Sequence, residues 1–336
     1  MKNDKLTERV CKTARSKIHS LYSIGVNKSG LHPAVSAKIW KRIVLPSALY
    51  SCELWSTLST TEIQKLDYIQ KHFARIVQGF SKYSPSLASI SNLGLWTVQG
   101  YIDKCQLLFL GRLLRADHSS IFYQIHRFIT TTAHTTFSPT MTLFKTAEKY
   151  QLSDILNSST VFDKREFSKL VVKATQNAEE RQWKCALSAD PSLSIFGKIH
   201  TTLRPNKLWL LVREDPSKRL LVNFLIQLSS MKIVCKQCLF CNKYSNNYNM
   251  HILLECIYTL DERQRLLENV LDIVDVYEYV VFENQDTETQ YLSLLGCVSE
   301  TSFNSISFCK WKEIMLCVAA IVYKIKGCFI VDCRKI

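Results

Sequence analysis

Four cysteines and one histidine lie close together between residues 235 and 256, and both residue types bind zinc in proteins. The run Cys235-Lys-Gln-Cys238-Leu-Phe-Cys241 is followed by His251-Ile-Leu-Leu-Glu-Cys256. Taking Cys238, Cys241, His251 and Cys256 gives the spacing C-x2-C-x9-H-x4-C. The C-x2-C pair places two thiolates on one tight turn, and a short helix turn brings the H-x4-C pair from the other side. The spacing predicts one tetrahedral zinc ion.

Four protein ligands leave no open position on zinc for a substrate or an activated water, so the predicted ion is structural. Cys235 stays an alternative to Cys238, which is preferred because the C-x2-C step then adjoins the loop. The competing interpretation is a group of buried free cysteines in a chain that has 13. The N-terminus lacks the apolar stretch of a secretory signal. We therefore expect an intracellular protein, nuclear or cytoplasmic and not secreted, whose cysteines are free or bind metal.

The motifs of common catalytic classes are missing from the sequence. No G-x-x-x-x-G-K-S/T, G-x-G-x-x-G, G-x-S-x-G or H-E-x-x-H occurs, and no two Asp residues are adjacent. Asp272 and Asp275 have no third carboxylate nearby and are interpreted as surface residues. His72, His126 and His200 are interpreted as surface or core residues. We expect no catalytic residue, no small-molecule substrate and no enzyme activity of the chain itself.

The positive charge of the chain is concentrated towards its N-terminus. The 43 Lys and Arg residues exceed the 29 Asp and Glu residues by 14. Residues 1–130 carry +11, residues 131–233 carry +6 and residues 234–336 carry −3. This distribution predicts a first half that binds a polyanion, and RNA or DNA is the expected partner. A basic surface that only keeps the protein in solution is the alternative.

Helices are predicted to carry most of the basic residues. With apolar residues at 47%, only nine Gly and seven Pro, the composition favours packed helices over a turn-rich β fold. An apolar stripe at helical spacing is formed by Leu6, Val10, Ala14, Ile18 and Leu21. A second helix starts near Pro33, is interrupted by Pro46, and has the apolar set Val35, Ile39, Trp40 and Ile43. Lys38, Lys41 and Arg42 are three and four residues apart and are predicted to form one basic stripe.

Ser59-Thr-Thr-Glu62 fits the capping box that begins many helices. The helix it predicts has a buried stripe of Ile63, Leu66, Ile69, Phe73, Ile76 and Val77. Lys71 and Arg75 lie outside this stripe. Together with Lys38, Lys41 and Arg42 they are predicted to contact phosphates, and an ordinary solvated helix face is the alternative.

The second half is also predicted to be mainly helical. Asp163 is expected to cap one helix, and Thr259-Leu-Asp-Glu262 repeats the capping-box pattern before the apolar stripe Leu267, Val270, Leu271 and Val274. A last stripe is formed by Trp311, Ile314, Met315, Val318, Ala319 and Val322. Its apolar run is too short to span a bilayer, so no membrane partner is expected.

The predicted fold is therefore mainly α, with five consecutive segments. These are a basic helical domain at 1–129, a Thr/Ser-rich linker at 130–160, a helical connector at 161–232, a zinc-binding module at 233–260 and a helical tail at 261–336. The linker is predicted because the sequence at 130–142 lacks charge and helical periodicity.

Three stretches of the first half, at 31–55, 71–80 and 92–116, resemble the region that follows the catalytic palm in reverse transcriptases of non-LTR (LINE-type) retrotransposons. Similar proteins carry P-x-x-x-Y-G-x-E-x-W there. Here the pattern is formed by Pro46, Tyr50, Ser51, Glu53 and Trp55, with Ser51 in place of the usual Gly. The cysteine cluster resembles the C-terminal zinc module of such polyproteins, whose H-x-L-x-x-C pattern is matched by His251, Leu253 and Cys256.

The resemblance covers roughly residues 15–260, and its blocks occur in the order found in that family. It implies a thumb-like helical bundle that grips the primer–template backbone, and a zinc module that contacts template RNA or target DNA. The palm with its Asp pair would lie before Met1, which implies a truncated or partial copy whose parent activity is RNA-directed DNA synthesis. The expected function is a non-catalytic nucleic-acid-binding fragment with a structural zinc ion. The alternative is a zinc-stabilised helical scaffold that binds proteins.

Overall fold

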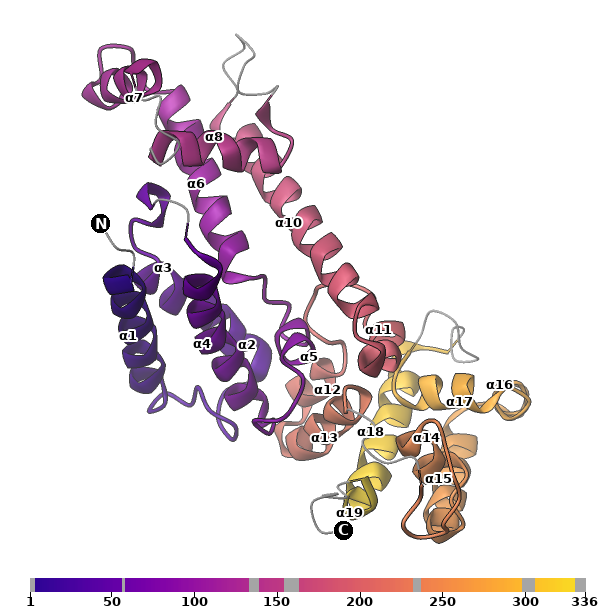
Figure 1. Cartoon of the computed structure of the whole chain (residues 1–336). Coiled ribbons are helices and arrows are strands. Elements are labelled where there is room, and N and C mark those ends of the chain that lie inside the picture. The colour runs from indigo at the N-terminus through magenta and orange to yellow at the C-terminus, as the bar shows by residue number, and fades with distance from the viewer. Residues whose placement is uncertain are drawn as a thin grey trace. The chain divides into compact units, whose positions relative to one another are not determined.

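A computed structural model describes residues 4–55, 58–132, 139–153, 163–231, 237–297 and 306–329. Every regular element in these ranges is a helix, which confirms the mainly α fold expected from the periodicity (Figure 1). The β pairing within them consists of two isolated bridges, Leu93 with Pro205 and Gln237 with Tyr244. Among the described helices, none combines the length and apolarity that a membrane span requires.

The chain forms two compact units that do not follow the five consecutive segments expected from the sequence. The first unit comprises Met1–Val26, Ser36–Ala74 and Leu95–Lys184. The second comprises Asn27–Val35, Arg75–Gly94 and Cys185–Ile336. The segments expected as a zinc module and a separate tail thus belong to one unit.

Among its described residues, the first unit contains seven whole helices and most of three others. These are α1 (Asp4–Leu21), α2 (Pro33–Ile39), η1 (Trp40–Val44), α3 (Leu45–Ala48), η2 (Cys52–Leu54), α4 (Thr60–Gln78), α6 (Val98–Leu114), α7 (Ile121–Thr132), α8 (Pro139–Lys149) and α10 (Lys164–Ser188). The expected linker at 130–160 includes α8, so part of it is helical. The reason is tertiary packing, because Leu143 and Ala147 of α8 are buried in one cluster with Leu107, Leu110 and Val171.

Two predicted helix starts are confirmed in the first unit. At α4, the Ser59 backbone N–H donates to Glu62 Oε2 at 2.7 Å, and the Glu62 N–H donates to Ser59 Oγ at 3.4 Å, as a capping box requires. At α10, Asp163 Oδ2 accepts from the Arg165 N–H at 2.8 Å. The stripe predicted for α4 is buried or half-buried throughout.

The second predicted helix is altered by a π-helical turn. Pro46 has no N–H to donate and its ring would collide with the carbonyl one turn earlier, so a regular α-helix cannot continue through it. The chain instead widens at η1, where the Leu45 N–H donates to the carbonyl of Trp40. This turn shifts the helical phase from Trp40 onwards, and Ile43, expected in the buried set, is 44% exposed. Val35, which precedes the turn, is 41% exposed, so the expected burial was wrong for both residues.

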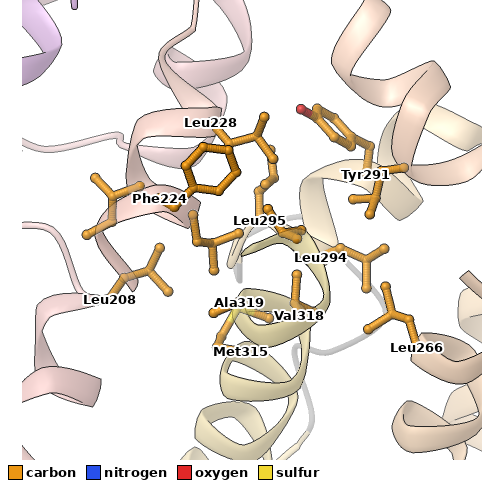
Figure 2. Packing of buried hydrophobic residues seen from close by; sticks show 14 of the residues in the cluster. Leu208, Phe224, Leu228, Leu266, Tyr291, Leu294, Leu295, Met315, Val318 and Ala319 are labelled. Atoms are coloured by element: carbon orange, nitrogen blue, oxygen red, sulfur yellow. The ribbon is translucent and has the colours of Figure 1, made fainter. Parts of the chain in front are cut away.

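The second unit contains the other described helices and the larger buried core. Its helices are α5 (Ser86–Ser91), η3 (Pro191–Leu193), α11 (Ser194–Ile199), α12 (Trp209–Glu214), η4 (Pro216–Lys218), α13 (Arg219–Ser229), α14 (Tyr248–Leu254), η5 (Ile257–Thr259), α15 (Leu260–Ile273), α16 (Val276–Glu283), α17 (Thr287–Leu294), α18 (Phe308–Lys324) and α19 (Lys326–Phe329). Helix α18 packs against α13 and α15. Figure 2 shows side chains of α18 such as Met315, Val318 and Ala319 at the centre of this core. All six residues of the last predicted stripe are buried.

The capping box predicted at Thr259 does not form. The Thr259 hydroxyl donates to the carbonyls of Ile252 and Cys256 and is not the acceptor at the start of α15. The end of the preceding helix offers unpaired carbonyls, and the hydroxyl satisfies these instead. Leu271, expected in the buried stripe of α15, is 40% exposed because Leu266 occupies the core-facing position.

Candidate metal centre

Cys238 and Cys241 lie on a tight turn of the second unit. The Cys238 N–H donates to the Lys243 carbonyl at 2.8 Å, and the Asn242 N–H donates to the Cys238 carbonyl at 2.8 Å. Asn242 has φ of 59°, in the left-handed region that Asn tolerates better than most residues. The turn is closed by the bridge between Gln237 and Tyr244. These backbone bonds present both thiols on one side of the loop.

His251 and Cys256 approach from the short helix α14 and the residues directly after it. Asn247 caps α14 through its side chain, which accepts from the Met250 N–H at 3.2 Å. At the other end, the Cys256 N–H donates to the His251 carbonyl at 2.7 Å. Because α14 ends here, Cys256 turns back towards the imidazole of His251. The predicted arrangement of a C-x2-C turn opposite an H-x4-C helix is thus present.

The four ligand atoms lie where one metal ion could contact all of them. They are within 4.8 Å of one another. The Cys238 and Cys256 sulfurs are 3.8 Å apart, which equals the edge of about 3.8 Å that two Zn–S bonds of ~2.3 Å give in a tetrahedron. Cys241 Sγ and His251 Nε2 are 3.1 Å apart, so this edge would lengthen by about 0.4 Å around zinc. Within the described residues, this is the group of His, Cys and acidic side chains that could hold a metal ion.

Hydrogen bonding favours thiolate formation at one corner of the site. Cys238, His251 and Cys256 are buried, and Cys241 is half-buried. Burial raises the pKa of Cys241, but hydrogen bonds from the Lys243 backbone and from His251 outweigh it and lower this pKa to about 7. Burial, with Cys238 as a further cause, raises the pKa of Cys256 to about 11. A cation among these sulfurs would deprotonate both thiols.

Glu255 is a contributor to the site that the sequence analysis did not include. Its Oε2 lies 3.1 Å from His251 Nδ1, on the side of the ring away from the cysteines. A carboxylate there accepts the Nδ1–H and leaves the Nε2 lone pair directed at a metal. Four-residue spacing on α14 was the signal that could have identified it, because residues i and i+4 are neighbours on a helix.

The alternative ligand Cys235 and the histidine and aspartate residues expected to have no catalytic role lie away from the four-residue cluster or outside the described residues. Cys235, the alternative ligand, lies outside the described residues, as does the side chain of His126. His72 is exposed on α4. His200 is buried, and its Nε2 lies 3.2 Å from the Ser91 carbonyl. Asp272 is exposed on α15 and Asp275 caps α16 with a complete capping box, consistent with surface roles.

The five basic residues expected to contact phosphates lie on three elements. Lys38 is exposed on α2 and Arg42 is exposed on η1, whereas Lys41 of η1 and Lys71 of α4 are half-buried. The π-helical turn means that Lys38, Lys41 and Arg42 do not share one regular α-helical stripe. Arg75 of α4 donates to the Ser84 carbonyl at 2.7 Å and to Ser86 Oγ at 2.8 Å, so its guanidinium is engaged within the second unit.

Comparison with known proteins adds no relative to this description. No family model, no curated protein and no solved structure matches the chain. Within its described residues the chain is all-helical and has a Cys3His group that can hold one metal ion.

Proposed function

We propose that this chain is a non-catalytic nucleic-acid-binding protein that is stabilised by one structural zinc ion, and that it derives from the C-terminal part of a non-LTR retrotransposon reverse transcriptase. The observation that carries the proposal is the convergence of the Cys238, Cys241, His251 and Cys256 ligand atoms within 4.8 Å. Three soft sulfurs and one imidazole nitrogen are a ligand set that favours zinc. With four protein ligands, the ion holds the turn and α14 together.

The charge of the first half supports a polyanionic partner. The 130 residues at the N-terminus carry +11, while residues 234–336, which include the four candidate zinc ligands, carry −3. Lys38 and Arg42 are exposed. Lysine and arginine side chains of this kind bind phosphates without reading the base sequence. The protein is therefore expected to bind RNA and DNA with little sequence preference.

Two backbone and packing features support the proposed origin. Ser51 occupies the position where similar reverse transcriptases carry Gly, and its φ is 62°, a left-handed conformation that Gly adopts without strain. Leu253, the central residue of the H-x-L-x-x-C pattern, is 1% exposed in the main core of the second unit. The left-handed backbone explains why the first pattern has Gly at this position, and the burial of Leu253 explains why the second pattern has Leu.

Metal analysis tests the zinc part of the proposal. Purified protein is expected to contain one zinc ion per chain, and Cys241→Ser and His251→Ala are expected to lose it. Cys309→Ser is the matched control, since Cys309 is an exposed cysteine of the same unit and is not among the four ligands. A folded wild-type protein without bound metal after purification under zinc-replete conditions would contradict the proposal.

A salt titration tests the nucleic-acid part. Binding to labelled RNA and DNA oligonucleotides should weaken steeply as salt rises, and charge reversal at Lys38, Lys41 and Arg42 should make the salt dependence shallower. Absence of binding at low salt would reject nucleic-acid binding. In that case the zinc-stabilised protein scaffold would become the better interpretation, because it requires the metal site without the phosphate contacts.

A further inference from the structure

A groove between α1 and α4 lies within the first unit and has a volume of about 650 Å³. One wall includes Glu8, Cys11 and Arg15, which are three and four residues apart on α1. The other wall includes Lys65 and Tyr68, three residues apart on α4. Side chains at these spacings share one face of a helix, so each helix presents one stripe to the groove. The volume lies in the range of ~300–1,000 Å³ that is typical of sites for small organic groups.

Tyr68 gives this groove an accessible aromatic ring. Its side chain is 61% exposed. The ring is stacked with that of His72, one turn further along α4, with centroids 6.4 Å apart and an interplanar angle of 5°. An aromatic ring held at the wall of a groove is a surface on which a nucleobase can stack. Such stacking tolerates any base sequence, because every base has a π face.

Arg15 and Lys65 place positive charge on both walls of the groove, and both are exposed. They act on the same thiol, since burial raises the pKa of Cys11 while the charges of Arg15 and Lys65 lower it. Glu8 is the acidic residue among those that line the groove, and it lies seven residues, about 10 Å, along α1 from Arg15. Helix α1 as a whole has five Lys and Arg residues against two Asp and Glu residues, a net charge of +3. The groove therefore favours an anionic ligand.

We infer that this groove binds one nucleotide unit of a single-stranded nucleic acid, with its base stacked on Tyr68 and the adjoining phosphates contacted by Lys65 and Arg15. The inference rests on the proposed function and adds that the bound segment is single-stranded, because a base inside a duplex is already stacked on its neighbours. The ammonium and guanidinium N–H groups donate to the non-bridging phosphate oxygens. The described residues that line the groove include none of the five basic residues expected from the sequence.

The first test measures stacking with the full-length, zinc-loaded chain, a labelled thymidine homopolymer and a labelled DNA duplex. Tyr68→Ala is expected to weaken binding of the homopolymer by about tenfold and to leave binding of the duplex unchanged. Tyr68→Phe keeps the ring and should bind both as the wild type does. Tyr277→Ala is the matched control, because Tyr277 is also a tyrosine on a helix surface, 78% exposed on α16 of the second unit.

The second test measures the phosphate contacts through the salt dependence of homopolymer binding. Arg15→Ala and Lys65→Ala are each expected to reduce the slope of log affinity against log salt by about 0.7, the value for one phosphate of a single strand. Lys17→Ala should retain the wild-type slope, since Lys17 is exposed on α1 but two residues from Arg15, and residues at that spacing do not share a face.

Photo-crosslinking tests the base contact directly. A thymidine homopolymer that contains 5-iodouracil is irradiated with the wild-type chain, and mass spectrometry is expected to find the crosslink at Tyr68. Two results would overturn the groove site while leaving nucleic-acid binding in place. One is an equal loss of single-strand and duplex affinity in Tyr68→Ala, and the other is unchanged affinity in that variant with no crosslink at Tyr68. Failure of the wild-type chain to bind at low salt would overturn both proposals.

Discussion

At the scale of single residues, the candidate metal centre depends on one acidic side chain as well as on its four ligands. Glu255 lies 3.1 Å from His251 Nδ1 and is 44% exposed at its side chain. Its carboxylate accepts the Nδ1–H and so orients the ring with Nε2 towards the cysteines. Because the exposed Glu255 side chain contributes little to the core, a substitution there should change metal affinity without changing the folding of the protein.

Glu255→Gln is expected to weaken zinc binding by about tenfold, because the neutral amide is a poorer acceptor for the Nδ1–H. Competition with a chromophoric zinc chelator measures the change. Glu268→Gln provides the control, since Glu268 is exposed on α15 in the same unit. Equal affinities for the Glu255 variant and the wild type would show that the carboxylate does not support the ligand.

Ser51 offers a second prediction at this scale. Its φ of 62° is unfavourable for any residue with a Cβ, at a cost of about 1–2 kcal/mol. Glycine removes that strain but gains freedom in the unfolded chain, which offsets about half of the benefit. Ser51→Gly is expected to raise the free energy of unfolding by about 0.5–1 kcal/mol in urea denaturation. Ser47→Gly, at an exposed position within α3, should lower it instead.

The four ligands could be predicted from sequence because their spacing is local and their chemistry is specific. Cys238 and Cys241 share one turn, and His251 and Cys256 share one helix end. The engagement of Arg75 by the Ser84 carbonyl could not be predicted, because it depends on how the chain after α4 folds back. No spacing rule connects residues that are brought together by tertiary structure alone.

At the scale of elements, regular apolar periodicity was a reliable guide and capping patterns were less so. The stripes of α1, α4 and α18 follow the sequence because each helix buries one face. Ser59 caps α4 as expected, whereas Thr259 has the same pattern but bonds to nearby carbonyls. Pro46 was expected to interrupt a helix, and a π-helical turn replaces the regular α-helix before it. At Thr259 the failure arose because neighbouring backbone carbonyls offered bonds that the pattern does not contain.

His200 connects two elements of the second unit in a way that depends on pH. It follows α11, and its ring bonds to the carbonyl of Ser91 at the end of α5. Burial lowers its pKa to about 4, from an ordinary value of 6.5. The folded protein therefore keeps the ring neutral while the unfolded chain takes up a proton. The contribution of His200 to the free energy of unfolding is fully present above pH 6.5 and is lost as the pH falls towards 4.

The expected loss between pH 7 and pH 4.5 is about 2 kcal/mol of unfolding free energy from His200 alone. Zinc release also destabilises the protein in acid, so the loss of stability in the wild type is compared with the loss in His200→Gln. The glutamine amide can donate to the Ser91 carbonyl but does not titrate. Urea unfolding at both pH values measures it. If the variant loses as much stability on acidification as the wild type, the neutral buried histidine is not responsible.

At the scale of the whole molecule, the metal site belongs to the main core of the second unit. Cys238 and Cys256 are buried in the same cluster as Leu253, Leu266 and Val318. Helix α14 packs against α17 and α19, and α15 packs against α18. The ion would therefore secure not only the C-x2-C turn but also the helices that depend on α14 for their packing. The first unit has a separate cluster around Leu107, Leu143 and Val171.

Removal of zinc with a strong chelator is expected to destabilise the core of the second unit and to leave the core of the first unit unchanged. Without the ion, the thiols at Cys238 and Cys256 remain buried but no longer bind the turn to α14, and folding free energy from metal binding is lost. Hydrogen exchange should show rapid loss of protection in α14, followed by α15 and α18, while α6, α8 and α10 keep theirs. Cys309→Ser, which retains all four ligands, should respond to the chelator as the wild type does. Uniform loss of protection over both cores would mean that they unfold as one cooperative unit, and unchanged protection in α14 would mean that metal does not stabilise this fold.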